Sequence, residues 1–479
     1  IGELMIILGT NSIKDTGYNV ANSLRVDRNS SAYLTRTEDT DQSDGKKITI
    51  SIWFKLGAQL GTTRYFFGGH ADGSYTNEIG ITSNDQLNFS CIANGTNQVT
   101  TNRVFRDPSA WYHVVAVLDS TQGTDTNRIK LYVNGVQETS FASSSYPSQN
   151  AVTEYLKNGG VTRVGDKGSG GNNWDGYLAE VCVLDGQALD QNSFGEFDDD
   201  SPTIWKPIDP SGLTFGNNGF YLDFEDSSNL GNDKNGGSDF SSNNLAATDQ
   251  STDTCTNNFC TLNPLDNSTA VAFDLTEGNL VLGDIGSGDN DHGLRGTFGV
   301  NAGKWYYEVK RLETGGTFGV IGSDVKLEFD LENETSGPAH IMSSNGTGSS
   351  LVYWNDGSFT NDASLQGYAA NDIIGVALDM DNGKLFFSIN GVFKGFDNNA
   401  SDPAAGTNAN FTDIPTDGTF MMPYVSKRGT ADPSDQYNFG NPSFSVSSGN
   451  TDGNGYGNFE YAPPSGYFAL CTKNLAENG

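Results

Sequence analysis

The residues whose types and spacing come nearest to catalytic machinery are three alternating carboxylates, Glu328, Asp330 and Glu332, in the stretch LEFDLENE. Two carboxylates hydrolyse a glycosidic bond when one attacks the sugar and the other gives and takes the proton; a retaining pair stands about 5 to 5.5 Å apart. Residues i and i+4 of a regular strand lie about 13 Å apart along its axis. Only a bulge or bend would unite Glu328 and Glu332, so we expect an exposed acidic strand or loop, with catalysis as the weaker alternative.

The same triplet is similar to the E-x-D-x-E pattern of jelly-roll glycoside hydrolases that cleave β-glucans. That resemblance implies Glu328 as the nucleophile and Glu332 as the acid/base. An acidic chain also produces such patterns by chance, and no H-E-x-x-H, G-x-S-x-G or P-loop motif is present. The histidines are scattered, at His70, His113, His292 and His340. We therefore expect a protein that is not an enzyme.

Aromatic rings beside amides and carboxylates suggest a second kind of site. They occur in two places, Trp174-Asp175 and Tyr353-Trp354-Asn355-Asp356. An exposed ring stacks on the apolar CH patches of a sugar, while neighbouring oxygens accept hydrogen bonds from its hydroxyls. Packing inside a core accounts equally well for each tryptophan. The two stretches are therefore candidate glycan contacts with a core role as the alternative.

The composition narrows the range of partners. With 27 basic and 59 acidic residues the net charge is -32, which disfavours nucleic acid. No run of 18 apolar residues exists, and the start has no basic stretch typical of a signal peptide, so we expect no membrane insertion. Five cysteines are too few for a disulfide framework in 479 residues. Cys255 and Cys260 are close enough in sequence to bridge, and that pairing stays open.

Strand and turn signals run through the whole chain. The stretch DIIGVALDMDNGKLFFSINGVFKG at 372–395 is an apolar strand, an acidic turn, an aromatic strand and an Asn-Gly, and a looser version, WYHVVAVLDSTQGTDTNRIKLYVNGVQ, lies at 111–137. Asn-Gly and Asp-Asn-Gly are turn residues of hairpins. Apolar residues at Ile129, Leu131 and Val133 alternate as in a half-buried strand. The chain is therefore predicted to be all-β, with two antiparallel β-sandwich domains in tandem, each built around such a hairpin.

Composition also predicts the domain boundaries. The acidic, proline-rich stretch FDDDSPTIWKPIDPSG at 197–212 interrupts the strands, and a Gly/Asn/Ser-rich stretch follows 226. We predict an anchoring or connecting segment at 1–22, a first sandwich at 23–226, a connector at 227–259 and a second sandwich at 260–479.

Both halves carry family resemblances. The ordered phrases ITISIWFKLG, WYHVVAVLD, IKLYVNGVQ and WDGYLAEVCVLDGQAL, within 23–190, resemble laminin-G-like, concanavalin A-like jelly rolls. The phrases GKWYYEVK, GTFGVIG, MMPYVS and YNFG, with the stretch at 372–395, resemble a SPRY domain over 300–440. The whole arrangement is similar to virion proteins of marine bacteriophages, in phrases such as GFYLDFEDSSNLGND and APPSGYFALCTKNL.

The first resemblance implies a metal candidate. Laminin-G-like domains often hold Ca²⁺ at the sandwich rim with Asp and Asn side chains, the hard oxygen ligands that this cation prefers. Asp119, Asp125 and Asn127 lie on one loop, which makes them the candidate ligands. Solvated turn residues are the simpler interpretation. No cofactor is required, and Ca²⁺ is the one candidate.

The function that these features imply is attachment. We expect a tail fibre, spike or head-fibre component on the virion surface, synthesised in the cytoplasm of the host bacterium. Its expected partners are other virion proteins and a host cell-surface glycan, with weak single sites strengthened by avidity. A homotrimer is a guess from how fibres are built. The alternatives are a purely architectural capsid or tail decoration protein and, with less support, a glycan depolymerase.

Overall fold

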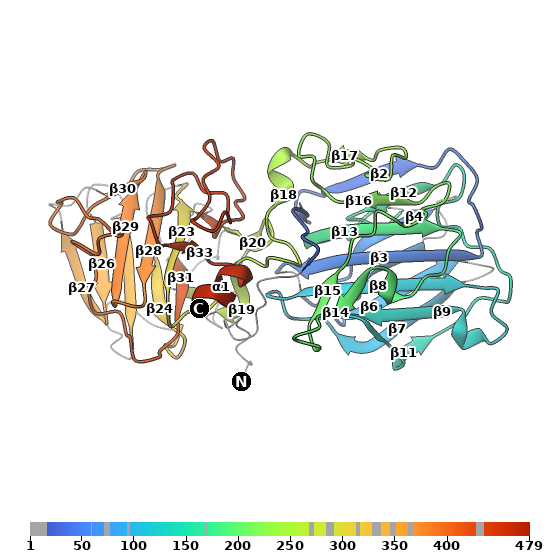
Figure 1. Ribbon diagram of the computed structural model, residues 1–479, viewed down its shortest axis with the longest axis horizontal. Helices are drawn as coiled ribbons and strands as arrows, with labels where there is room; N and C mark the ends of the chain where they lie inside the picture. Colours follow the sequence, from blue (N-terminus) through green and yellow to red (C-terminus); the bar gives the residue numbers. More distant parts are fainter. Residues whose placement is uncertain are drawn as a thin grey trace. The chain divides into compact units, whose positions relative to one another are not determined.

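The structure is a computed structural model that describes residues 17–58, 60–70, 77–92, 96–168, 170–267, 273–283, 292–312, 317–327, 337–344, 351–362, 367–427 and 435–479. These residues form two compact units, one ending at Thr256 and the other spanning Asn257–Gly479. In Figure 1 the first unit runs from blue to green and the second from yellow to red. Antiparallel sheets make up both units, which confirms the prediction of an all-β protein with tandem sandwiches.

The first unit contains two large sheets, named here after a central strand. The β3 sheet has the order β10-β9-β8-β3-β13-β1-β18 with β16 beside β13, and comprises β1 (Ser23–Val26), β3 (Lys47–Leu56), β8 (Trp111–Asp119), β9 (Ile129–Val133), β10 (Val136–Gln137), β13 (Gly176–Asp185), β16 (Phe220–Leu222) and β18 (Gln250–Ser251). The β6 sheet has the order β11-β7-β6-β5-β4-β12-β2-β17, and comprises β2 (Tyr33–Thr37), β4 (Arg64–His70), β5 (Asn77–Ile81), β6 (Gln86–Ile92), β7 (Thr96–Val104), β11 (Phe141–Ser144), β12 (Val161–Val164) and β17 (Ser241–Asn243). A small ribbon pairs β14 (Gly195–Phe197) with β15 (Trp205–Pro207), and short 3-10 turns lie at η2 (Asp125–Asn127), η3 (Gln191–Ser193) and η4 (Ala247–Asp249).

The β3 sheet is covered on both faces. Ile50, Ile52 and Phe54 of β3 point into the sandwich core. On the opposite face Trp53 packs with Trp205, and Lys55 forms a fully buried ion pair, Nζ to Oδ2 of Asp253 at 2.7 Å. Almost every residue of β3 is therefore buried, although sequence alternation alone would leave one face wet.

The predicted connector at 227–259 is wrong, because residues up to Thr256 belong to the first unit. Strand β17 pairs with β2, and β18 pairs with β1. Leu230 and Phe240 lie in the sandwich core. A polar, glycine-rich composition suggested a free linker, whereas a few apolar residues fix this segment to the sheets. The second unit begins at Asn257, close to the predicted start at 260.

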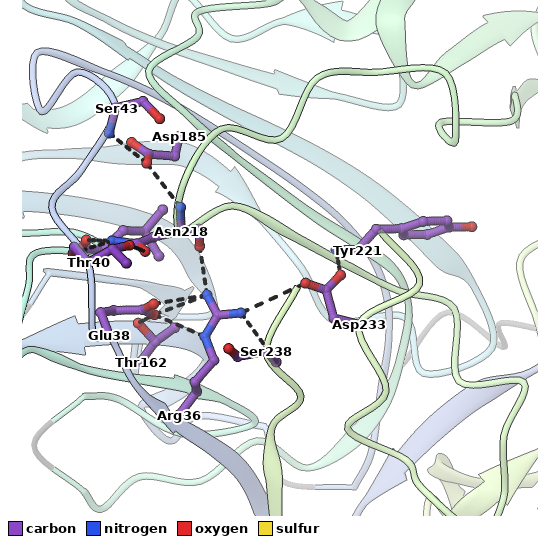
Figure 2. Close-up of polar contacts among 11 residues, drawn as sticks. Arg36, Glu38, Thr40, Ser43, Thr162, Asp185, Asn218, Tyr221, Asp233 and Ser238 are labelled. Carbon is purple, nitrogen blue, oxygen red and sulfur yellow. Dashed lines mark hydrogen bonds and ion pairs between the residues drawn. The ribbon is translucent and has the colours of Figure 1, made fainter. Parts of the chain in front are cut away.

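A buried arginine holds the same segment in place (Figure 2). Arg36 of β2 is 8% exposed, and its Nη2 lies 3.0 Å from Oε2 of Glu38. The guanidinium also donates to the carbonyls of Asn218 (2.6 Å) and Ser238 (3.0 Å), and it lies 4.6 Å from the ring centroid of Phe240. A buried cation needs several acceptors, so these contacts draw residues 218–240 against β2.

Of the predicted anchoring segment 1–22, residues 1–16 lie outside the described residues. Residues 17–22 pack on the first unit, where Val20 is buried with Trp53, Ala179 and Trp205, and a role as an anchoring or connecting segment stays a prediction.

The second unit also has two sheets. The β24 sheet has the order β19-β22-β31-β24-β25-β26-β27, and comprises β19 (Leu262–Asn267), β22 (His292–Gly296), β24 (Thr317–Gly322), β25 (Ala339–Ser344), β26 (Leu351–Asn355), β27 (Ser358–Asp362) and β31 (Met421–Lys427). The β28 sheet has the order β20-β21-β32-β23-β28-β29-β30 with β33 parallel to β23, and comprises β20 (Leu275–Thr276), β21 (Val281–Leu282), β23 (Lys304–Lys310), β28 (Ile373–Asp379), β29 (Lys384–Ile389), β30 (Val392–Phe393), β32 (Asp435–Asn438) and β33 (Phe468–Ala469). The helix α1 (Thr472–Asn478) ends the chain.

The repeated stretch is a scaffold element in both units. It forms the hairpins β8–β9 and β28–β29, each followed by an Asn-Gly turn. Asn134 and Asn390 adopt positive φ values of 46° and 48°. The side-chain oxygen of Asn134 accepts from the backbone N–H of His113 at 2.8 Å, and Asn390 accepts in the same way from Ile373 at 3.0 Å. In each hairpin the turn residue therefore caps the neighbouring strand.

All five cysteines are free thiols, so Cys255 and Cys260 are not bridged. Within the described ranges, no helix has the length and apolar character needed to cross a membrane.

Candidate functional site

A polar cluster forms at the edge of the β24 sheet, where β25, β26 and β27 meet. Asp356 and Gly357 make a two-residue hairpin turn between β26 and β27, with φ values of 47° and 82°. Both values are positive, as in the hairpin turn for which Asp-Gly is favoured. Oδ1 of Asp356 accepts from the N–H of Ala339 at 3.0 Å, which ties the turn to the start of β25. His340 and Asn355 are direct neighbours in the strand register.

Asp413 reaches this cluster from the long segment between β30 and β31. Nε2 of His340 lies 3.1 Å from Oδ1 of Asp413 and 3.9 Å from Oδ1 of Asp356. Nδ2 of Asn355 donates to Oδ2 of Asp413 at 2.8 Å. One atom each from His340, Asp356 and Asp413 therefore lies within 4.8 Å of the other two.

The charges of this cluster are unbalanced. Burial holds the pKa of His340 below its ordinary value, against the opposing pull of Asp356 and Asp413, so its imidazole is neutral at neutral pH. Burial acts to raise the pKa of Asp413, but the hydrogen bond from Asn355 and the neighbouring His340 outweigh it and hold that pKa below its ordinary value. Asp356 and Asp413 thus lie beside one imidazole, and within the described chain His340 is the basic side chain that they are recorded to contact.

An aromatic group connects the cluster to a cleft. Phe411 contacts His340 edge to face, with ring centroids 5.1 Å apart, and contacts Phe387 at 6.3 Å. Tyr353 stacks on Phe396 at 3.9 Å with an interplanar angle of 9°. Phe396 in turn packs against Phe411 at 5.2 Å.

The cleft has a volume of about 480 Å³. Apolar side chains form part of its lining, namely Met342, Leu351, Phe387, Ile389 and Val392. Polar side chains form another part, namely Asp372, Asn390, Lys394, Asn398 and Asn410. Such a combination of apolar surface and convergent polar groups is typical of a small-ligand site.

Two of the cleft's polar residues hold its shape. Asn410 accepts from the N–H of Phe387 at 2.8 Å and donates to the carbonyl of Lys394 at 3.1 Å. Asn390 donates to Asp372 at 2.7 Å. Lys394, by contrast, is exposed and bonds to the exposed Asn398 at 3.0 Å, so its ammonium has further donors for a ligand.

The predicted ring at Trp174 is not exposed, which corrects its assignment as a glycan contact. Trp174 is fully buried, with its ring edge to face against Phe54 and Phe66, and Asp175 is 3% exposed. The tryptophan has a core role because β4 and β3 enclose it.

The second predicted stretch is divided between core and surface. Trp354 is buried with Ile341 and Tyr424. Asn355 and Asp356 join the polar cluster, and Tyr353 is half-buried. Alternation along β26 explains the division, since neighbouring residues of a strand point to opposite faces.

The candidate calcium loop contains an arginine whose guanidinium bonds to nearby backbone carbonyls. Arg128 donates to the carbonyls of Gln122 (2.9 Å), Gly123 (3.1 Å) and Pro147 (2.8 Å). Asp119 accepts from Thr121 and Gln122. Asp125 and Asn127 lie in η2, where Asp125 accepts from the N–H of Thr126. The guanidinium of Arg128 thus already bonds to three backbone carbonyls in this region, and calcium binding by Asp119, Asp125 and Asn127 stays a prediction.

Glu328, Asp330 and Glu332 lie outside the described residues. Catalysis by this triplet stays a prediction.

Sequence reasoning missed three titratable positions. His340 was one of four scattered histidines, and Asp413 lies 73 positions after it. Glu180 lies at a bulge in β13 with φ of 48°, and accepts from the hydroxyl of Tyr221 at 2.8 Å. Burial raises the pKa of Glu180 to about 8.

The fold defines a protein of two antiparallel β-sandwiches. Residues 28–193 match the family model of the concanavalin A-like lectin/glucanases superfamily (Laminin_G_3), and residues 304–425 match the SPRY domain model. The chain therefore carries a laminin G-like domain followed by a SPRY domain. All the residues that line the cleft and the whole polar cluster lie in the SPRY match.

Similarities to solved structures are distant. The SPRY domain of human HERC1 and the PSpry domain of TRIM65 each show 17% identity and a TM-score of 0.27, over 37% of this chain and 96% and 91% of theirs. A heptameric SAP-like pentraxin from Limulus polyphemus shows 20% identity and a TM-score of 0.27, over 36% of this chain and 80% of its own. A search of curated proteins gave no match.

Proposed function

We propose that this chain is an attachment component of a bacteriophage particle, which binds a host cell-surface glycan through the cleft of its SPRY domain. The observation that supports binding most directly is the cleft of about 480 Å³ with its apolar lining and polar rim. This volume falls within the range of about 300–1,000 Å³ for small-ligand sites.

The chemistry of the cleft suits a sugar. Ile389 and Val392 offer apolar surface for the CH face of a ring, with the buried Phe387 also in the lining. Lys394 and Asn398 at the exposed rim supply donors and acceptors for hydroxyl groups. Repeated copies on a particle would raise the overall affinity by about 10²- to 10⁴-fold without new contacts.

The proposed location on a particle is supported by sequence resemblance to phage virion proteins. A net charge of -32 also disfavours nucleic acid as the partner. Other virion proteins would hold the chain on the particle surface.

The test is binding to purified bacterial surface glycans. Lys394→Met removes the ammonium at the cleft rim and should weaken binding about tenfold, since a hydrogen bond to a charged group contributes about 1.5–3 kcal/mol. The matched control is Lys326→Met, an exposed lysine of the same unit that does not line the cleft. Equal losses in both variants, or no glycan that binds, would contradict the proposal.

One observation favours the architectural alternative. The corresponding hairpins of the two units each expose a valine, Val136 at 53% and Val392 at 58%. Single exposed apolar side chains need no partner, so the corresponding positions of the two valines, rather than their exposure, carry this alternative. In that case both valines would be needed for particle assembly, and neither for glycan binding.

A further inference from the structure

We propose that His340, Asp356 and Asp413 form a binding site for a divalent transition metal, with Zn²⁺ as the best match. This site is separate from the cleft, and the proposal does not depend on the glycan function.

The geometry of the cluster is close to that of a metal site. Two ligand atoms bound tetrahedrally to one Zn²⁺ at 2.0–2.1 Å lie about 3.3 Å apart. Nε2 of His340 lies 3.1 Å from Asp413 and 3.9 Å from Asp356, on either side of that value. The two aspartates are half exposed, so small rotations of their side chains are enough to complete the geometry.

A fourth ligand is available beside them. Oδ1 of Asn355 is buried and makes no hydrogen bond within the described residues. A flip of this amide would exchange its oxygen with Nδ2, which now points at Asp413. The fourth position can therefore be the oxygen of Asn355 or a water molecule.

A metal would balance the charge of the cluster. The carboxylates of Asp356 and Asp413 lie beside the same imidazole and repel one another, and a dication would offset that repulsion. Nε2 of His340 now contacts Oδ1 of Asp413 at 3.1 Å, and a carboxylate can only accept a hydrogen bond, so Nε2 carries the proton. Coordination through Nε2 would replace this hydrogen bond by a bond to the metal and move the proton to Nδ1.

The ligand types select the class of metal. A histidine nitrogen with two carboxylates suits Zn²⁺, Co²⁺ or Ni²⁺. Ca²⁺ takes 6–8 oxygen ligands, and a histidine nitrogen is not among those it prefers. The cluster is therefore chemically different from the predicted calcium loop around Asp119.

The position of the site gives the metal a structural role. It would join the neighbouring strands β25 and β26 to the segment between β30 and β31, which carries Asp413. That segment also contributes Asn398 and Asn410 to the cleft. Metal binding would thereby fix one wall of the cleft.

The experiment is a titration of the chelator-treated full chain with Co²⁺, followed by visible absorption, and with Zn²⁺ by calorimetry. We expect one ion per chain, Co²⁺ bands that Zn²⁺ removes, and no competition from equal Ca²⁺. Asp413→Asn should weaken binding at least about tenfold, because a charged ligand is lost. Asp417→Asn is the control, since this exposed carboxylate of the same segment bonds to Thr419 and lies outside the cluster.

Either of two results would overturn the proposal. One is the absence of saturable binding at one ion per chain. The other is equal affinity in wild type, Asp413→Asn and His340→Gln. Asp413 is half exposed, so its variant folds even if the buried His340 variant does not. Because the readout is metal binding, a failure of the glycan proposal leaves this test unaffected.

Discussion

Nε2 of His340 lies 3.1 Å from Oδ1 of Asp413, although 73 positions separate the two residues in the sequence. The contact joins the edge of the β24 sheet to the segment that precedes β31. The same two elements contribute Met342 and Asn410 to the cleft. The polar cluster and the cleft therefore share their supporting elements, and changes at one should be felt at the other.

Zinc should stabilise the SPRY domain. A ligand at 100 times its Kd adds about 2.7 kcal/mol to the free energy of unfolding. We predict that the thermal transition of this unit rises with Zn²⁺ in the wild type and in Asp417→Asn, and not in Asp413→Asn. Differential scanning calorimetry of the full chain measures both units at once. An equal rise in Asp413→Asn would place any bound zinc elsewhere.

Arg36 should be essential for the first unit. Arg36→Met leaves Glu38 and Asp233 without their buried cation, a change that typically costs 3–5 kcal/mol. Arg103→Met is the matched control, because Arg103 is 49% exposed in its pair with Glu138 and should cost less than about 1 kcal/mol. Urea denaturation of both variants measures the difference. Similar losses would show that the network in Figure 2 is not what secures residues 218–240.

His113 should make the first unit sensitive to acid. Its Nδ1 accepts from Nε1 of Trp205 at 2.9 Å and its Nε2 bonds to Oγ of Ser51 at 2.8 Å. Burial lowers the pKa of His113 to about 3. Because the unfolded value is about 6.5, the folded state binds fewer protons, and stability falls as pH drops from about 6.5 towards 3, by up to about 1.4 kcal/mol per pH unit.

The measurement is the urea midpoint between pH 7 and 4. His113→Gln keeps a donor and an acceptor but does not titrate, so its midpoint should fall less steeply than that of the wild type. Parallel curves would mean that other groups dominate the acid response.

Glu180 should make the first unit less stable as pH rises, whereas His113 makes it less stable as pH falls. Burial raises its pKa to about 8, above the ordinary 4.5. The folded state therefore binds more protons, and the contribution of Glu180 to stability, complete below pH 4.5, is lost as pH rises towards 8. Glu180→Gln should flatten this decline, measured as the difference in unfolding free energy between pH 5 and 8. An unchanged slope would exclude Glu180 as its source.

The sandwiches could be predicted because their signals are local. Asn-Gly after an apolar strand specifies a hairpin, and Asn134 and Asn390 both take the positive φ that such a turn requires. The end of the first unit could not be predicted in the same way. Residues after 226 have the composition of a linker, but a few contacts such as those of Arg36 hold them on the first unit.

The candidate site was predicted only in part. Asn355 and Asp356 were named from their aromatic neighbours, and both belong to the cluster. His340 and Asp413 meet only when a long segment folds back on the sheet, and no spacing in the sequence encodes that approach. Trp174 was named by the same pattern and lies in the core instead, because an aromatic residue beside a carboxylate is equally typical of a core.

The central claim is tested most directly by binding of the labelled full chain to bacterial cells, host and non-host, with a matched pair of variants. Val392→Asp places a charge at the cleft, whereas Val136→Asp makes the same change at the corresponding hairpin of the first unit. We predict saturable binding to the host, reduced at least about tenfold in Val392→Asp and unchanged in Val136→Asp. Absence of binding to any host, or equal binding by both variants, would contradict a glycan-binding cleft and favour the architectural alternative.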